Sequence, residues 1–307
     1  MRIFVTGASG VIGRRLVPAL LHRGHEVSAS ARSAEQAAQL ARGGVRALVL
    51  SLFDRTALDG ALAHQEVVIN LATHMPASTF KMFLPGAWRQ NDRLRRVASA
   101  KLVEAALASG AGRFIQESFA PAYPDRGSAW ISEATALAPA RYNRSLLDAE
   151  RAAARFSEHG RTGVVLRFAS FYGADARHLA DLSRCVRAGY APLPGAPQAY
   201  ISSVSHDDAA SAVLAALELP AGIYNVADDE PLTHRDYLDS LASALGVAPP
   251  KFAPAWLALL AGSLGELLSR SQRISNRALR AASPWQPQYP SARSGWTAAV
   301  QAWHCSG

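Results

Sequence analysis

The sequence predicts an α/β fold, a mostly parallel β-sheet with helices on both faces, followed by a smaller and mostly helical C-terminal lobe. Three observations predict it. The chain opens with a strand, a glycine-rich turn and a helix, short apolar runs then alternate with helical patterns, and helical patterns predominate in the last third of the 307 residues. Such alternation favours a parallel sheet, because each helix returns the chain to the edge where the next strand starts. This length favours one large domain with a smaller lobe.

The first strand, turn and helix lie near the amino terminus. Ile3 to Val5 read as a short buried strand, and Leu16, Leu20 and Leu21 follow at helical spacing. Between them stand three glycines in a Gly-x-x-Gly-x-x-Gly arrangement: Gly7, Gly10 and Gly13. Glycine permits positive φ and lets backbone N–H groups approach a ligand, while the helix N-terminus adds a partial positive charge. These features fit the pyrophosphate of a dinucleotide, so the sequence predicts a Rossmann-type, doubly wound sheet.

The second strand, predicted for Glu26 to Ala31, bears on which dinucleotide binds. In NAD sites an acidic residue commonly ends this strand and holds the ribose 2′-hydroxyl, whereas a nearby arginine accommodates the 2′-phosphate of NADP. Ala31 stands in the place of the acid, and Arg32 follows it. NADP(H) is therefore favoured over NAD(H). The alternative is that Arg32 is a solvated loop charge.

Four further apolar runs predict the next strands: Ala47 to Leu50, Val67 to Leu71, Arg113 to Gln116 and Val164 to Phe168. Residues Asn91 to Ser109 read as a long helix with one apolar face. The run that ends at Leu71 breaks into a turn at the carboxyl edge of the sheet, where ligands lie in open α/β sheets. His74 and Met75 follow and are expected to face a bound nicotinamide. For His74 the alternative is a loop histidine bonded to nearby backbone.

Composition excludes several classes of protein. The net charge is +8, but the arginines are scattered and form no basic tail, which argues against nucleic-acid binding. No signal-peptide pattern is present and no apolar run reaches the roughly 18 to 20 residues that a membrane span needs. Two distant cysteines, Cys185 and Cys305, predict neither a disulfide framework nor a metal site. These observations favour a cytoplasmic protein that binds a small molecule.

Motifs along almost the whole chain carry a family resemblance. Besides the glycine turn they include the stretch from Arg113 to Tyr123 and the stretch from Tyr142 to Glu150. The others are Leu166-Arg167, Phe171-Tyr172-Gly173, Val204 to Ala210, Ile223 to Val226, Trp285-Gln286-Pro287 and Gly295-Trp296. On these motifs the chain resembles an extended short-chain dehydrogenase/reductase, of the NAD-dependent epimerase/dehydratase family, which contains sugar-nucleotide epimerases, dehydratases and carbonyl reductases. The motifs are specific to the fold, not to a substrate.

The resemblance implies a catalytic Ser, Tyr and Lys. Tyr142 matches the tyrosine and Ser118 is expected to orient the substrate oxygen, although the local register also permits Phe119 at the serine position. The lysine four residues after the tyrosine is absent, because position 146 is Leu. A phenol has an ordinary pKa of about 10, and a neighbouring cation lowers it whereas a leucine does not. Tyr142 is therefore expected to stay protonated, as a proton donor for reductions and a poor base for oxidations.

Glu117 is a further candidate for catalysis. A carboxyl group at the end of a buried strand can have a raised pKa and serve as acid or base. The alternative is a charge paired with a nearby arginine. The family's helix asparagine is also replaced, because Arg95 stands at its position and Asn91 lies one turn earlier.

The resemblance further implies contacts and domain limits. Cofactor contacts are expected from Gly7, Ser9, Gly10, Val11, Ile12, Gly13, Arg32, Leu52, Leu71, Ala72, Thr73, Tyr142 and Phe168. Substrate contacts are expected from His74, Met75, Ser118, Phe119 and Tyr200. Residues 1–173, with a return over 199–226, would form the dinucleotide-binding domain, and residues 174–198 with 227–307 the substrate lobe. Between Ala174 and Pro197 the chain reads as irregular, and the predicted lobe helices are Arg235 to Leu245, Pro254 to Ser269 and Ile274 to Ala282.

The expected activity is an NADP(H)-dependent oxidoreductase that reduces a carbonyl group or polarised double bond of a small organic substrate. Two alternatives stay open: a sugar-nucleotide epimerase or dehydratase, and a regulatory protein that binds the dinucleotide without turnover. The resemblance also implies a homodimer formed through the helices at Asn91 to Ser109 and Tyr142 to Glu158.

Overall fold

A computed structural model describes residues 1–76, 86–192, 196–254, 265 and 268–305. Seven parallel strands form its central sheet in the order β11-β7-β5-β4-β1-β2-β3. Their bounds are β1 Arg2–Thr6, β2 Glu26–Ala31, β3 Arg46–Val49, β4 Val67–Asn70, β5 Arg113–Phe119, β7 Thr162–Phe168 and β11 Gly222–Val226. The order reverses between β1 and β4, and in open α/β sheets ligands lie outside the carboxyl ends of the strands at such a reversal. The predicted α/β fold is confirmed.

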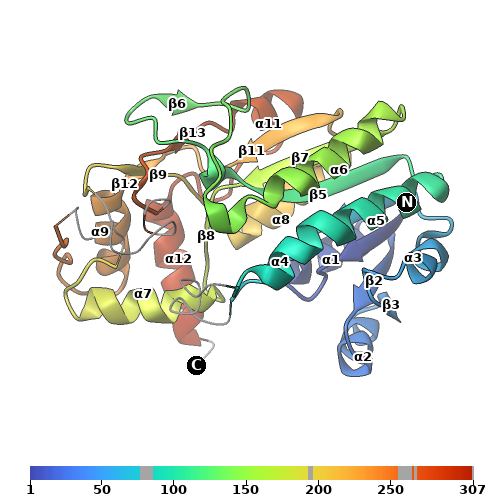
Figure 1. The fold of residues 1–307 in the computed structure, drawn as a ribbon. Coiled ribbons are helices and arrows are strands. Elements are labelled where there is room, and N and C mark those ends of the chain that lie inside the picture. The colour runs from blue at the N-terminus through green and yellow to red at the C-terminus, as the bar shows by residue number, and fades with distance from the viewer. Residues whose placement is uncertain (77–85, 193–195, 255–264, 266–267, 306–307) are drawn as a thin grey trace.

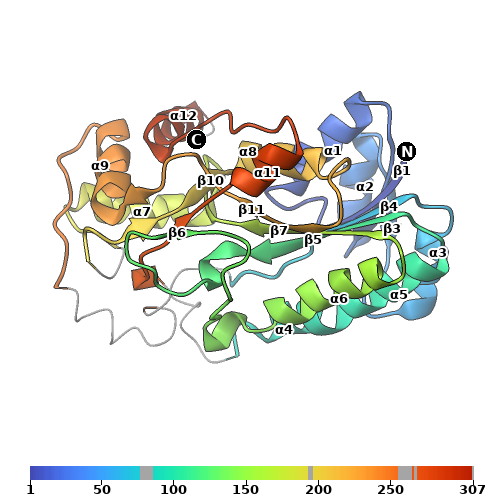
Figure 2. The same cartoon turned by 90° about the horizontal axis from the view of Figure 1, so that it is seen from above.

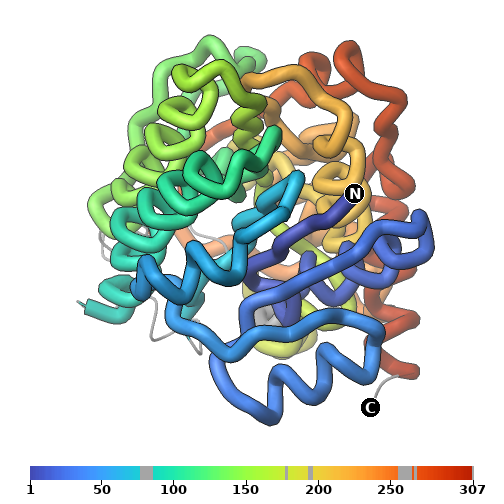
Figure 3. The backbone as a smooth tube through the Cα atoms, turned by 90° about the vertical axis from the view of Figure 1, so that its right-hand side faces the viewer, coloured from blue at the N-terminus to red at the C-terminus, as the bar shows by residue number. Residues whose placement is uncertain are grey.

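Helices cover both faces of the sheet (Figures 1 and 2). On one face lie α1 Gly13–His22, α8 His206–Ala215 and α11 Arg277–Ala282, and on the other α3 Arg55–Leu62, α5 Ser99–Ala108 and α6 Leu146–Glu158. The helix α2 Ala34–Arg42 packs at the β3 edge. Two apolar clusters fill the layers, one around Leu16 and Ile69, the other around Phe114 and Phe156. Figure 3 shows the amino-terminal strand running between the two layers.

The helix predicted for Asn91 to Ser109 is present, with an irregular turn in its middle. It consists of α4 Arg89–Arg93, a π-helical turn η2 at Leu94–Ala98 and α5. A π turn adds one residue to a helical turn and so changes which side chains face the sheet. Asn91, Arg95 and Ser99 are buried along this helix. Its carboxyl half is apolar and packs in the core, whereas its amino half directs polar groups inward.

The remaining elements lie mostly at the carboxyl edge. The strands are β6 Trp130–Ile131, β8 Ser170–Tyr172, β9 Tyr200–Ile201, β10 Ser203–Ser205, β12 Leu232–Thr233 and β13 Arg273–Ile274. The helices are α7 Arg177–Arg187, α9 His234–Ala244 and α12 Ala292–Cys305, and short 3-10 turns lie at Ala120–Ala122 and Arg141–Asn143. A third apolar cluster, around Leu179, Leu241 and Trp296, joins α7, α9 and α12. None of the described helices is long and apolar enough to cross a membrane.

Two local predictions differ from the structure. The segment Ala174 to Pro197 is not irregular throughout, because α7 occupies 11 of its residues and buries Leu179 and Val186 in the third cluster. The helix predicted over Ile274 to Ala282 begins only at Arg277, after the short strand β13. The predicted helix Pro254 to Ser269, with Trp256, lies almost entirely outside the described residues.

Candidate functional site

The glycine turn between β1 and α1 is built so closely that two of its positions exclude any side chain. Gly7 has a φ of +72°, and a Cβ atom there would lie 2.5 Å from the carbonyl oxygen of Leu71 at the end of β4. At Gly13 a Cβ would collide with the carbonyl oxygens of Gly7 and Ala8. The Gly10 N–H closes the turn by donating to Gly7 at 2.9 Å. This backbone cradle at a helix N-terminus fits the pyrophosphate of a dinucleotide.

Polar side chains line the end of β2, beside the glycine turn. The Gln36 side chain donates to the Ser9 hydroxyl and accepts a 2.7 Å hydrogen bond from the Arg32 backbone N–H. Ser33 caps α2 by accepting from the Gln36 N–H. Ala31 is buried, whereas Arg32 is exposed, and within the described residues its guanidinium has no hydrogen bond or ion pair. A cation that no described residue pairs with thus stands beside a helix N-terminus, an arrangement suited to a phosphate.

Asn70 fixes the carboxyl end of β4. Its side-chain oxygen accepts from the Thr6 hydroxyl at 2.6 Å, and its amide donates to Ser99 and Gln116 at 3.1 and 2.9 Å. All four side chains are buried. Sequence reasoning missed this network, because polar residues inside strand and helix patterns carry no signal of their partners.

The loop after β4 carries several of the expected contacts. Leu71 is buried, while Thr73, His74 and Met75 are exposed. The His74 backbone N–H donates at 3.0 Å to the side chain of Asn91, which is buried. Asn91 therefore holds the shape of this loop, and the His74 ring remains exposed to solvent.

Tyr142 lies in the 3-10 turn before α6, packed against Trp88. The two ring centroids are 4.6 Å apart and the rings are inclined by 45°. Burial raises the pKa of the Tyr142 phenol well above its ordinary value, and the positive charges of Arg95 and Arg270 oppose that rise only in part. Leu146, at the position of the family's lysine, is fully buried. The phenol is therefore protonated at neutral pH.

Ser118 is buried in β5 and its hydroxyl donates to the Glu150 carboxylate of α6 at 2.5 Å. A serine hydroxyl has one proton to donate, so in this arrangement it cannot also donate to a substrate oxygen. Successive side chains of a strand point to opposite faces, so Phe119 points away from the face that Ser118 occupies, and it is half-buried.

Glu150 also belongs to a fully bonded ion pair. Arg167 of β7 contacts both of its oxygens, at 2.8 and 2.7 Å, and donates to the Tyr123 hydroxyl at 2.7 Å. Tyr123 in turn donates to Asn225 of β11 at 2.9 Å. These contacts join α6 to three strands of the sheet, which is a structural role.

Glu117 pairs with Arg95 of η2. The Oε1 and Nη2 atoms are 3.2 Å apart, and both side chains are nearly buried. Of the two alternatives for Glu117, a catalytic carboxyl or a partner of an arginine, the structure contains the ion pair.

Three other residues expected to contact the cofactor or the substrate pack mainly against other protein side chains. Phe168 is fully buried at the end of β7, where its ring centroid lies 5.4 Å from that of Phe171. Leu52 is half-buried against the second apolar cluster. Tyr200 is half-buried beneath the guanidinium of Arg273, 4.8 Å from its ring centroid. Across the described ranges, no group of three or more His, Cys, Asp or Glu side chains is placed to hold a metal ion.

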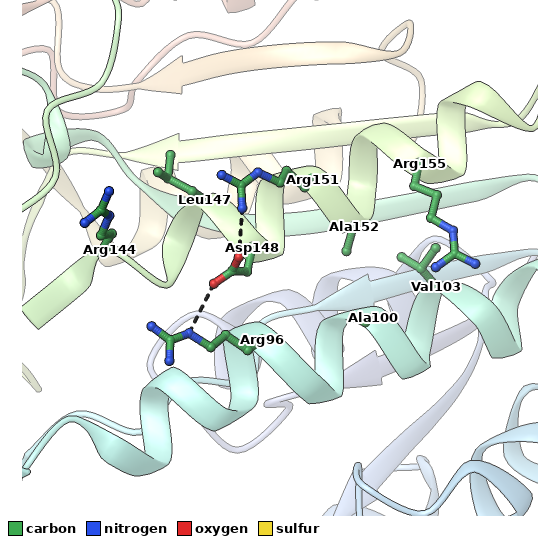
Figure 4. Close-up of a pocket in the computed structure, with 9 residues that line it drawn as sticks. All are labelled: Arg96, Ala100, Val103, Arg144, Leu147, Asp148, Arg151, Ala152 and Arg155. Carbon is green, nitrogen blue, oxygen red and sulfur yellow. Dashed lines mark hydrogen bonds and ion pairs between the residues drawn. The ribbon is translucent and has the colours of Figure 1, made fainter.

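A separate groove of about 640 Å³ lies between α5 and α6, on the face of the sheet opposite α1. Four arginines line it, Arg96, Arg144, Arg151 and Arg155, over a floor of small and apolar residues. Figure 4 shows Asp148 linked to both Arg96 and Arg151. The groove is strongly basic and is distinct from the glycine turn.

Comparison with known proteins identifies a matching family and curated relatives. Residues 3–227 match the model of the NAD dependent epimerase/dehydratase family. A 3-diazoavenalumate denitrifying reductase from a Streptomyces species is 36% identical over 96% of this chain and 99% of its own length. A 4-hydroxy-2-methyl-3-oxo-4-farnesyl-3,4-dihydroquinoline-1-oxide ketoreductase from Stigmatella aurantiaca is 28% identical over 88% of this chain and 81% of its own.

Two solved structures share the whole fold. The human epimerase family protein SDR39U1, solved with NADPH, superposes with a TM-score of 0.82 at 18% identity and covers 98% of this chain and 99% of its own. MoeE5, solved with UDP-glucuronic acid and NAD, has a TM-score of 0.80 at 21% identity and covers both chains fully. The chain therefore belongs to the NAD dependent epimerase/dehydratase family and is an NAD(P)-dependent enzyme of the extended short-chain dehydrogenase/reductase type.

Proposed function

We propose that the protein is an NADPH-dependent reductase. When bound, NADPH supplies a hydride to a carbonyl group or polarised double bond of a small organic substrate, and Tyr142 donates the proton to the substrate oxygen. The glycine turn would hold the pyrophosphate, and the loop after β4 would lie beside the nicotinamide. We assign substrate binding to the lobe formed by residues 174–198 and 227–307.

The protonated state of Tyr142 carries this proposal. Its phenol is half-buried and packs against Trp88, its pKa is raised, and Leu146 stands at the position of the family's lysine. A general acid must hold its proton until the transition state, whereas a general base must lose it beforehand. Tyr142 thus suits reduction, in which it donates a proton, better than oxidation of an alcohol.

The names of the two relatives support reduction of the substrate rather than its oxidation. One is a denitrifying reductase and the other a ketoreductase, and neither name includes a sugar nucleotide. A sugar-nucleotide epimerase is the less favoured alternative, because its reaction would require Tyr142 to accept a proton first.

Preference for NADPH over NADH is supported by the residues at the end of β2. Arg32 offers a guanidinium that no other described residue pairs with, and Ser33 a hydroxyl at the N-terminus of α2, while Ala31 has no side-chain oxygen for a ribose hydroxyl. A 2′-phosphate complements these groups and a 2′-hydroxyl does not.

A second candidate reaction is the reductive removal of a diazo group. In it, hydride adds to the carbon that bears a cationic N₂ group, the C–N bond breaks, and N₂ leaves with the bonding electrons, so no proton is consumed. The Ser118 hydroxyl already donates to Glu150, and Leu146 supplies no cation. Two of the three groups that the family resemblance implies for proton transfer are therefore occupied or missing, which matters less for a reaction that consumes no proton. The denitrifying reductase relative acts on a diazo compound by name.

One experiment separates these readings. Purified protein is given NADPH with a panel of aromatic ketones and diazo compounds, and the loss of nicotinamide absorbance is followed for the wild type and for Tyr142→Phe. For ketone reduction the variant should be about 100-fold slower or more, since the proton donor is lost. Diazo reduction should continue at the wild-type rate. The exposed Tyr190→Phe is the matched control. Absence of NADPH consumption with every compound, despite NADPH binding, would instead favour a regulatory protein.

A further inference from the structure

A buried charge pair, Arg95 with Glu117, includes a residue of η2, the turn that packs against the helix after Tyr142. Arg95 lies in the π turn, between Asn91 and Ser99 on the inward side of the helix. Asn91 holds the loop after β4 and Ser99 contacts Asn70 at the end of β4, so Arg95 between them lies at the carboxyl edge of the sheet. Its partner Glu117 stands near the carboxyl end of β5. The pair therefore adjoins the site where the nicotinamide is expected.

The bonding of Arg95 differs from that of a structural arginine in the same chain. Arg167 places three donors on acceptors and holds both oxygens of Glu150. Arg95 makes one 3.2 Å contact to Glu117, and its Nε atom is buried without a hydrogen-bond partner among the described residues. A buried guanidinium that satisfies so few of its donors is costly to retain for stability alone. The position of Arg95 thus indicates a role beyond packing.

Arg95 acts electrostatically on Tyr142. The η2 turn packs against α6, which follows directly on the turn that carries Tyr142. The positive charge of Arg95 is the largest of the influences that oppose the rise in the pKa of Tyr142 on burial, ahead of that of Arg270. Arg270 donates hydrogen bonds to the backbone carbonyl oxygens of Tyr123 and Ala138, so its guanidinium also holds the backbone in place.

We infer that Arg95 supplies the fixed cation of this active site, held by Glu117, and serves as a positioning residue that acts through Tyr142 in place of a lysine at position 146. The inference rests on the proposed function. During reduction, hydride forms the new C–H bond, the C=O π electrons move to oxygen, and that oxygen takes the Tyr142 proton. Tyr142 is left as a phenolate, which the Arg95 charge stabilises until solvent returns a proton. Arginine never deprotonates in this range, so its charge is constant with pH.

The test removes the pair without burying a lone charge. Arg95→Met with Glu117→Leu replaces both partners by apolar groups of similar size, a change that buried ion pairs often tolerate. The matched control is Arg96→Met. Arg96 is the neighbouring arginine of η2, is exposed and pairs with Asp148 (Figure 4). Thermal unfolding and NADPH binding are measured for each variant, to separate folding from function.

Two readouts are then compared. The first requires no turnover: 3-nitrotyrosine is placed at position 142, and its ionisation is followed by visible absorbance in each background. The midpoint should rise by about one pH unit in the double variant and stay unchanged with Arg96→Met. The second is ketone reduction with Tyr142 intact, which should fall about tenfold in kcat while the Kd for NADPH changes little.

An unchanged midpoint in the folded double variant would overturn the inference, and so would wild-type kcat. If the wild type reduces no substrate but the midpoint still rises, the electrostatic coupling of Arg95 to Tyr142 stands and the proposed reductase activity fails instead.

Discussion

Tyr142 and Arg32 define the two ends of the proposed cofactor site. Tyr142 is half-buried beside Trp88 and retains its proton, and Arg32 is exposed with an unpaired guanidinium among the described residues. Both residues could be identified as candidates from the sequence, because their residue types match the expected roles. Burial, which determines the state of the phenol, depends on Trp88, 54 positions earlier in the chain by their numbers, and no local pattern indicates that contact.

Replacement of Arg32 by Gln tests the cofactor preference. Loss of a charge-assisted contact to a 2′-phosphate is worth about 1.5 to 3 kcal/mol, or roughly 10- to 100-fold in Kd. The Kd for NADPH should rise by that factor, and the Kd for NADH should not change. Both are measured by fluorescence titration of the nicotinamide. Arg42→Gln, at the other end of α2 and also exposed, is the control for loss of charge. Equal effects of the two variants would rule out a 2′-phosphate site at Arg32.

Ser118 illustrates the limit of sequence reasoning for a single residue. The spacing from Ser118 to Tyr142 suits a catalytic serine, yet the hydroxyl donates to Glu150 on the face covered by α6. A shift of one position along a strand moves a side chain to the opposite face of the sheet. An uncertainty of one residue in the alignment therefore decides whether Ser118 faces the substrate or the helix. Glu117 was ambiguous for a similar reason, because its arginine partner comes from another element.

At the scale of elements, the strands were predicted well and the irregular helices were not. Runs such as Val67 to Leu71 are short, apolar and bounded by turn residues, and β4 ends within one residue of the prediction. The helix α7 was missed because glycines and prolines near its ends outweighed the periodic Leu179, Leu182 and Val186. The π turn η2 has no sequence signal, since it depends on packing between α4, α5 and α6.

Helix α9 gives a prediction about pH. His234 is its first residue, is 1% exposed, and burial lowers its pKa from 6.5 to about 4. The unfolded chain therefore binds a proton below about pH 6.5 that the folded protein does not take up until about pH 4. Stability is complete above this window and falls as the pH drops through it, by about 3 kcal/mol in total.

Thermal unfolding of His234→Gln checks this effect. Between neutral pH and about pH 5 the wild type should lose more stability than the variant, because the variant has no imidazole to protonate. His22→Gln, an exposed histidine of α1, should behave like the wild type. A pH dependence that is identical in the wild type and His234→Gln would show that His234 makes no contribution.

For the whole molecule, the parallel sheet and its dinucleotide edge follow from the beta-alpha alternation, whereas the assembly state does not. We propose a homodimer through α5 and α6, as the resemblance implies. A two-fold contact sets the same patch against itself, so the four arginines of the groove would meet their copies. Salt screens such repulsion. The dimer fraction should therefore increase with ionic strength.

Sedimentation at low and high salt measures this directly. Arg151→Glu would place carboxylates opposite arginines and should favour the dimer at low salt, because Arg151 is exposed and lines the groove. Arg42→Glu, at the far end of α2, is the control of equal charge change. A monomer under all conditions, including the Arg151→Glu variant, would show that this face is not a dimer interface.

The pH dependence of ketone reduction tests the central claim most directly. If Tyr142 donates its proton from a half-buried phenol with a raised pKa, kcat/KM with saturating NADPH should be constant from about pH 6 to about pH 9, and Tyr142→Phe should lower it throughout. A kcat/KM that increases with pH in this range and reaches its plateau only when the phenol ionises would contradict the claim, because the phenolate would then be the active form.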